Sequence, residues 1–99
     1  MKILAIEKEM PDVTEEQFRP ELLKAEAARA WELYQAGVLR ELYFRQDRPE
    51  AVLVLECPTV QDAHDTLDTL PLVREHLIAF DLIPLCAYPG FARLFSDRK

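Results

Sequence analysis

The alternation of hydrophobic and polar residues along the chain predicts four β-strands. Two β-rich runs, over 38–45 and 51–56, are separated by Gln-Asp-Arg-Pro-Glu, a spacing typical of a hairpin with a short polar loop. A first strand is predicted over 3–6 and a last strand over 77–87. Pro84 lacks a backbone donor, which indicates that the last strand lies at an edge or contains a bulge.

A hydrophobic spacing of three and four residues predicts a long amphipathic helix between the first two strands. Thr14 and Gln17 fit a capping box at its start. Pro20 cannot lie deep inside a helix without a clash, so we expect a kink or a restart with Pro20 in a first turn. Gly37 is suited to end the helix.

A second, shorter helix is predicted after the hairpin. Thr59 can cap it, Pro71 stops it, and residues 72–76 form a connector to the last strand. The order is therefore βαββαβ, which predicts an α+β fold of the ferredoxin-like type. This fold has an antiparallel four-stranded sheet with two helices on one face, and its first strand lies between the third and the fourth.

The strands are apolar on both sides, because Val52 and Val54 alternate with Leu53 and Leu55. The helices cover only one face of the sheet, so an apolar face would stay open, and such a face favours association. We therefore expect a homodimer or larger homo-oligomer formed sheet to sheet, with the aromatic C-terminal tail reaching the partner.

Composition narrows the class of protein. Ninety-nine residues, 1–99, are expected to form a single domain. The net charge of −6 argues against binding to nucleic acid or to anionic membranes. The sequence has no apolar run of ~20 residues for a membrane span and no signal-peptide core, so a cytoplasmic location is expected. Cys57 and Cys86 have no metal-ligand spacing and are expected to stay reduced, and no metal site is predicted.

Several short motifs together resemble the muconolactone Δ-isomerase family, within the dimeric α+β barrel superfamily. The residues that carry the resemblance are Glu26, Ala30, Leu33 and Gly37, then Arg40 and Leu42, His64-Asp65-Thr66-Leu67, Leu70-Pro71-Leu72, Asp81, and Leu85-Cys86 with Pro89. The chain departs from the pattern at Glu41, where a histidine would strengthen the match, in the hairpin loop, and by about two extra residues between Leu72 and Asp81.

The resemblance implies a cofactor-free isomerase of aromatic catabolism. Such an enzyme moves a proton, and with it a double bond, within a small carboxylated lactone or enol. It assembles as a ring of subunits. The departures lie near the expected pocket, so they bear on the substrate more than on the fold.

Glu26 is the first candidate for the chemistry. A lactone isomerase needs a base that titrates near the working pH and a cation for the substrate carboxylate or the developing enolate. A single acid on the apolar side of a helix would be desolvated, which raises its pKa. The alternative is that Glu26 lies on the solvated edge of the helix beside Lys24 and Arg29.

His64 and Arg40 complete the candidate machinery. Histidine titrates near neutral pH and could carry protons, although His64 could equally be a core-edge histidine bonded to a carbonyl. Arg40 could hold a carboxylate through two hydrogen bonds, and the alternative is a surface arginine paired with Glu41.

The candidate binding residues include aromatic and charged side chains. Trp31, Tyr34 and Tyr43 could form a wall over a flat ligand, but we favour a core position for aromatic residues at this spacing. Each strand also carries one acid: Glu7, Glu41, Glu56 and Asp81. If these acids share a face they need partners, with Arg45 the nearest, and Asp81 is expected to be buried. For Glu7 and Glu56 we favour the simpler view that they end their strands.

Two other functions stay open from the sequence. One is a non-catalytic oligomeric module that binds a small molecule. The other is a cofactor-free monooxygenase or cyclase of the same superfamily, acting on a polyaromatic substrate. A closed pocket without convergent charged groups would favour the binding module.

Overall fold

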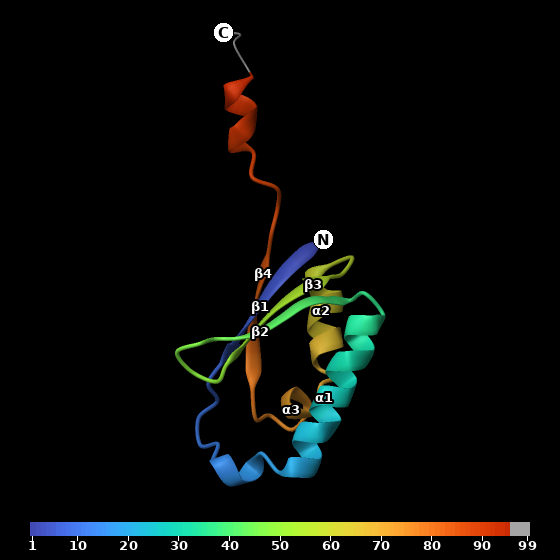
Figure 1. Cartoon of the computed structure of the whole chain (residues 1–99), viewed down its shortest axis with the longest axis vertical. Helices are drawn as coiled ribbons and strands as arrows, with labels where there is room; N and C mark the ends of the chain where they lie inside the picture. The colour runs from blue at the N-terminus through green and yellow to red at the C-terminus, as the bar shows by residue number, and fades with distance from the viewer. Residues whose placement is uncertain (96–99) are drawn as a thin grey trace.

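The computed structural model describes residues 1–95 of the chain. Its strands and helices follow the expected order (Figure 1). They are β1 (Lys2–Lys8), α1 (Pro20–Gln35), β2 (Leu39–Phe44), β3 (Ala51–Glu56), α2 (Val60–Leu67), α3 (Pro71–Arg74) and β4 (Ala79–Pro84), with 3-10 turns at Glu15–Gln17 and Gly90–Leu94.

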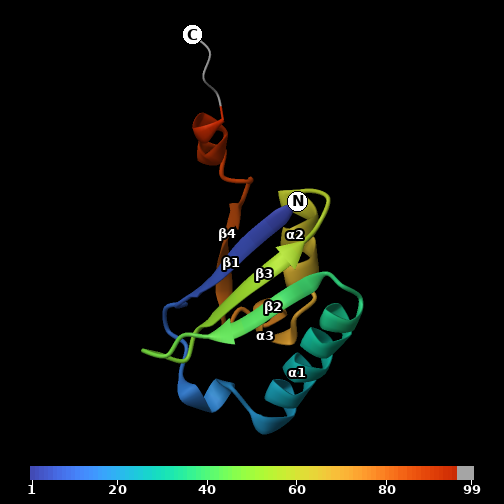
Figure 2. The same ribbon diagram turned by 45° about the horizontal axis from the view of Figure 1, so that its top comes forward.

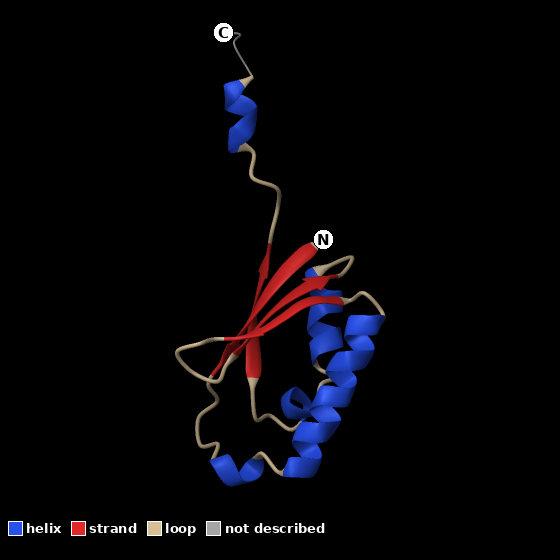
Figure 3. Ribbon diagram, viewed as in Figure 1, coloured by secondary structure: helices blue, strands red, loops and turns tan. Residues whose placement is uncertain are grey.

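The four strands form one antiparallel sheet in the order β2-β3-β1-β4, which is visible in Figure 2. β1 therefore lies between β3 and β4, and the predicted ferredoxin-like fold is confirmed. The helices gather on one side of the sheet (Figure 3). A register shift between Leu39 and Glu41 interrupts the pairing of β2 with β3 at Arg40.

The long helix shows the restart at Pro20 that was one of the two expected outcomes. Gln17 Oε1 accepts a hydrogen bond of 2.8 Å from the Thr14 backbone N–H, but this box supports only a 3-10 turn. α1 restarts at Pro20, in the first turn, where a missing N–H costs nothing. Gly37 ends the helix in a left-handed conformation with φ of 79°, and the Val38 N–H donates to the Leu33 carbonyl at 3.1 Å.

The second half of the chain differs from expectation at its element boundaries. Thr59 caps α2 by accepting a 3.0 Å hydrogen bond from the Asp62 N–H, as predicted. α2 ends at Leu67, however, and Pro71 opens the short helix α3 where a connector was expected. β4 is shorter than predicted, and Pro84 is its last residue, on an edge strand.

The core lies between the helices and one face of the sheet. Ile3 and Ala5 of β1 and Leu53 and Leu55 of β3 are buried there, together with Leu33 of α1. The side chains that alternate with them occupy the opposite face, which no element between residues 1 and 95 covers. These include Leu4, Ile6, Val52 and Val54, which are half-buried, and Tyr43 and Ile83, which are exposed.

The chain after β4 leaves the body of the molecule as an extended arm, residues 85–95 (Figure 1). The radius of gyration is 16.8 Å and the longest axis is 62 Å, whereas a compact domain of this size has a radius of about 13 Å. The arm exposes large apolar side chains, namely Leu85, Tyr88, Phe91, Leu94 and Phe95. Within residues 1–95, no helix has the length and apolarity needed to cross a membrane.

Candidate functional site

A cavity of about 270 Å³ lies between α1 and the helix-facing side of the sheet. Its walls are apolar side chains from α1, from the strands and from the segment around α3. Leu23, Leu42 and Phe44 line it and are themselves exposed, so they form its rim. Among residues 1–95, the polar side chains that line the cavity are two, the carboxyl groups of Glu7 and Glu26.

Glu26 reaches the cavity from α1. Its Oε1 accepts a hydrogen bond of 2.9 Å from the Leu72 backbone N–H, one of the donors that the first turn of α3 leaves free. Burial raises the pKa of Glu26 above its ordinary value, and the Leu72 hydrogen bond opposes this by stabilising the carboxylate. The neighbouring charge of Glu7 adds to the rise, whereas Arg74 counteracts it.

Glu7 reaches the same cavity from β1. Strand alternation places it on the face of Ile3 and Ala5, and its Oε1 accepts a 2.8 Å hydrogen bond from the Ala51 N–H. Burial raises the pKa of Glu7, the Ala51 hydrogen bond lowers it, and the charge of Glu50 raises it further. The cavity therefore holds two desolvated carboxyl groups fixed by backbone donors.

A second hollow, an open groove of about 490 Å³, adjoins the cavity and shares Ala27, Ala30 and Leu42 with it. Arg40 lines this groove, and its Nε donates to the Gly37 carbonyl. Among residues 1–95, no carboxylate forms an ion pair with Arg40, so the alternative of a pairing with Glu41 is not seen.

Three aromatic side chains and the carboxyl group of Glu41 form the rest of the groove wall. Trp31 and Tyr34 stack with ring centroids 5.8 Å apart, and Tyr43 lies on β2. Their exposed fractions are 58%, 51% and 56%. The favoured core position is therefore wrong for all three, and they are available to a ligand.

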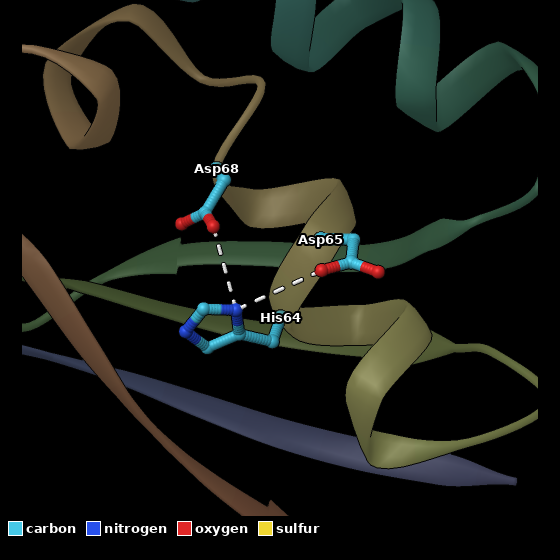
Figure 4. A group of neighbouring side chains, drawn as sticks. All are labelled: His64, Asp65 and Asp68. Atoms are coloured by element: carbon cyan, nitrogen blue, oxygen red, sulfur yellow. Dashed lines mark ion pairs between the residues drawn. The ribbon is translucent and has the colours of Figure 1, made fainter.

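His64 does not share the cavity with Glu26. It lies on the exposed surface of α2, with Nδ1 at 3.4 Å from Asp68 and 3.9 Å from Asp65 (Figure 4). The alternative of a core-edge histidine is wrong, because 61% of its side chain is exposed. The potential ligand atoms of these three residues lie within 4.8 Å of one another, so they form a group that could hold a metal ion. Exposed acidic groups commonly gather in this way without an ion.

Arg45 and Asp81 are also outside the cavity. Arg45 forms ion pairs with Asp47 at 2.6 Å and with Glu50 at 3.7 Å. Asp81 was expected to be buried, but 63% of its side chain is exposed, and it pairs with Lys8 at 3.1 Å.

The four strand acids do not share one face. Glu7 lies on the helix-facing side, and the other three lie on the open side. There Glu41 accepts a hydrogen bond from the Tyr43 hydroxyl, and Glu56 accepts one from the N-terminal amine.

The sequence profile described as muconolactone delta-isomerase matches residues 3–90, which is most of the chain. The chain belongs to the muconolactone delta-isomerase family. The resemblance drawn from the sequence motifs is thereby confirmed. No curated protein matches the sequence.

Two solved structures share the fold of this muconolactone delta-isomerase family member. A crystal structure of muconolactone isomerase at 3.3 Å resolution matches with a TM-score of 0.73 and 25% identity, over 91% of this chain and 93% of that one. The 5-chloro-2-hydroxyhydroquinone dehydrochlorinase (TftG) from Burkholderia phenoliruptrix AC1100, in complex with 2,5-dihydroxybenzoquinone, matches with a TM-score of 0.68. Its identity is 17%, over 91% of this chain and 98% of that one, so it shows the fold alone.

Glu7 lines the cavity of this family member, although its position in the sequence was interpreted as a strand end. β1 instead extends to Lys8. The signal was present, because Ile3, Ala5 and Glu7 follow the two-residue period of one strand face. An acid in register with two buried apolar residues points at the core.

Proposed function

We propose that this protein is a cofactor-free isomerase that shifts a proton and a double bond within a small carboxylated lactone or enol. The observation that carries the proposal is the apolar cavity with the Glu26 carboxyl group fixed inside it. Excluding water there raises the pKa of Glu26 toward the range that suits a general base. Membership of the muconolactone delta-isomerase family supports the same reaction class.

In the proposed mode of binding, the ring of the substrate occupies the cavity and its carboxylate extends into the adjoining groove. Arg40 would hold the carboxylate, because it is the cation of that groove and forms no ion pair with a carboxylate within residues 1–95. Trp31, Tyr34 and Tyr43 would cover the part of the ligand that lies in the groove. Glu26 would take the proton from carbon through Oε2, because its Oε1 already accepts the hydrogen bond from the Leu72 N–H.

The two other functions are less well supported. A non-catalytic binding module would be favoured by a closed pocket without convergent charged groups, whereas Glu7 and Glu26 both line this cavity. A monooxygenase or cyclase that accepts a polyaromatic substrate needs a large cleft. The cavity of about 270 Å³ is below the ~300–1,000 Å³ typical of drug-sized ligands, so a polyaromatic substrate would fit only by filling the adjoining groove as well.

The test is turnover of muconolactone and related lactones, followed by NMR in deuterated water. Glu26→Gln retains an oxygen that can accept the Leu72 N–H, so we expect a folded variant whose kcat falls about 10²- to 10⁴-fold. Arg40→Ala should mainly raise KM, by about 10- to 150-fold, if it removes a charge-assisted hydrogen bond of about 1.5–3 kcal/mol.

The matched control for Glu26→Gln is Glu32→Gln, an exposed acid of the same helix. It should leave turnover unchanged. Unchanged kcat in Glu26→Gln would remove Glu26 from the mechanism. If the wild type turned over none of the lactones, the proposed function would be rejected.

We also propose that the protein assembles with further copies of itself through the open face of the sheet. The centre of that face carries half-buried apolar side chains, and its edge strands expose Tyr43 and Ile83. The arm exposes five more large apolar residues away from the body. Burying such surfaces is favourable by roughly 25 cal/mol per Å². A second copy offers the same apolar surfaces and is the occupant we infer.

Light scattering at micromolar concentration tests the assembly. Val54 is half-buried in the centre of the open face. Val54→Lys should shift the protein toward monomer without unfolding it, because the lysine can extend into solvent in the single chain. Gln35→Lys, on the exposed end of α1, is the control. A wild-type monomer would contradict the proposal.

A further inference from the structure

We propose that Glu7 is a second catalytic carboxyl group, which acts as the acid opposite Glu26 as the base. The inference rests on the proposed isomerase function and adds the group that returns the proton. Within residues 1–95, the cavity has no polar side chain besides these two carboxyl groups. A proton delivered inside the cavity by a side chain therefore comes from Glu7 or Glu26.

The two carboxyl groups approach the cavity from different elements. Glu7 comes from the sheet and Glu26 from α1, which covers it. In each group Oε1 is held by a backbone N–H, from Ala51 at 2.8 Å and from Leu72 at 2.9 Å. Within residues 1–95, Oε2 of each group has no protein hydrogen-bond partner, so each carboxyl group is anchored on one side and free to meet a ligand on the other.

The proposed function assigns the roles of the two groups. Burial raises the pKa of both carboxyl groups, and no cation from residues 1–95 lines the cavity, so two negative charges there are unfavourable and the pair is assigned one proton. Glu50 lies beside Glu7 but pairs with Arg48 at 3.0 Å, and Arg74 lies near Glu26. Because Glu26 is the base of the proposed function, this proton belongs to Glu7 as the acid.

The reaction balances with these two groups alone. Glu26 carboxylate accepts the proton as a C–H bond of the substrate breaks, and the electron pair moves through the conjugated system toward the lactone carbonyl. A new C–H bond then forms at the other end of the shifted double bond, with the proton from the Glu7 carboxylic acid. Turnover leaves Glu26 protonated and Glu7 ionised, and transfer of one proton between them restores the starting state.

The experiment compares Glu7→Gln with the wild type across pH. Glutamine keeps the acceptor for the Ala51 N–H, so the variant should fold. It cannot supply the acid, so kcat should fall about 10²-fold or more with little change in KM. In the wild type, kcat should fall at high pH as Glu7 loses its proton, and Glu7→Gln should lose this alkaline limb. Glu15→Gln, in the exposed 3-10 turn, is the control and should behave as the wild type.

A second measurement does not depend on activity. NMR titration of ¹³C-labelled glutamate carboxyl groups should show the Glu7 midpoint moving to lower pH in Glu26→Gln, because the opposing charge is gone. An unchanged midpoint would overturn the pairing. Full kcat and an intact alkaline limb in Glu7→Gln, with an inactive Glu26→Gln, would overturn the role of Glu7 alone. If the wild type turned over none of the lactones, the proposed function itself would be rejected.

Discussion

Replacement of Gly37 by alanine tests the left-handed conformation that ends α1 next to Arg40. Gly37 has φ of 79°, a left-handed conformation that glycine adopts freely. Among residues 1–95, a Cβ built there meets Arg40 Nε alone, at 3.9 Å, which is an ordinary contact. The cost of Gly37→Ala is therefore conformational and does not include a steric clash.

The magnitude follows from two opposing terms. A left-handed conformation costs an L-residue roughly 1–2 kcal/mol. Alanine also lowers the entropy of the unfolded chain, which returns about 0.4–1 kcal/mol. We therefore expect the free energy of unfolding to fall by about 1 kcal/mol, equivalent to a drop in Tm of about 4–8 °C for a domain of this size.

Urea unfolding at fixed protein concentration measures the change, because any self-association makes stability depend on concentration. Gly37→Asn is the first control and should lose less, since asparagine tolerates the left-handed region. Ala36→Gly, one residue earlier in a right-handed conformation, is the second and should lose about 0.5–1 kcal/mol. A Gly37→Ala variant as stable as the wild type would refute the left-handed cap. A loss of more than about 3 kcal/mol in the free energy of unfolding would mean that a Cβ at position 37 meets a steric clash.

Three further predictions concern stability and assembly. Burial raises the pKa of both Glu7 and Glu26 above the ordinary 4.5, so the folded state binds these protons more tightly than the unfolded state. Their contribution to stability is complete below pH 4.5 and is lost as pH rises through the folded pKa values. The free energy of unfolding, measured with urea, should therefore fall less as pH rises above 4.5 in Glu7→Gln and Glu26→Gln than in the wild type. Thr59→Ala removes the cap of α2 and should cost about 1 kcal/mol in the same assay, whereas an unchanged midpoint would contradict the capping bond. Truncation after Pro84 removes the arm and should reduce the oligomer mass in light scattering, and an unaltered mass would exclude the arm from assembly.

The fold could be predicted from the sequence because its signals are local. The hairpin, the strand alternation and the glycine at the end of α1 each depend on a few neighbouring residues. The boundaries were less predictable, because they depend on contacts between distant segments. α2, for example, ends at Leu67 and Pro71 opens a further short helix, although Pro71 was expected to stop α2.

The site could be predicted only in part. Glu26 was identified by its place on the apolar side of a helix, and it does line the cavity. Its hydrogen bond to Leu72 spans 46 positions in the sequence, and no local pattern reveals it. His64 fitted the resemblance and the helix spacing equally well, but the direction of its side chain depends on how α2 packs against the sheet. Trp31, Tyr34 and Tyr43 are exposed despite spacing that is typical of a core.

The two edges of the sheet limit how copies of the chain can associate. On β4, Pro84 has no N–H to offer an added strand. On β2, the register shift at Arg40 and the neighbouring charge of Glu41 disturb the regular row of backbone donors and acceptors. Proline, charge and irregular pairing are the means by which sheet proteins block edge-to-edge growth. Concentrated solutions of this protein should therefore yield closed particles of discrete mass, without amyloid-like fibrils.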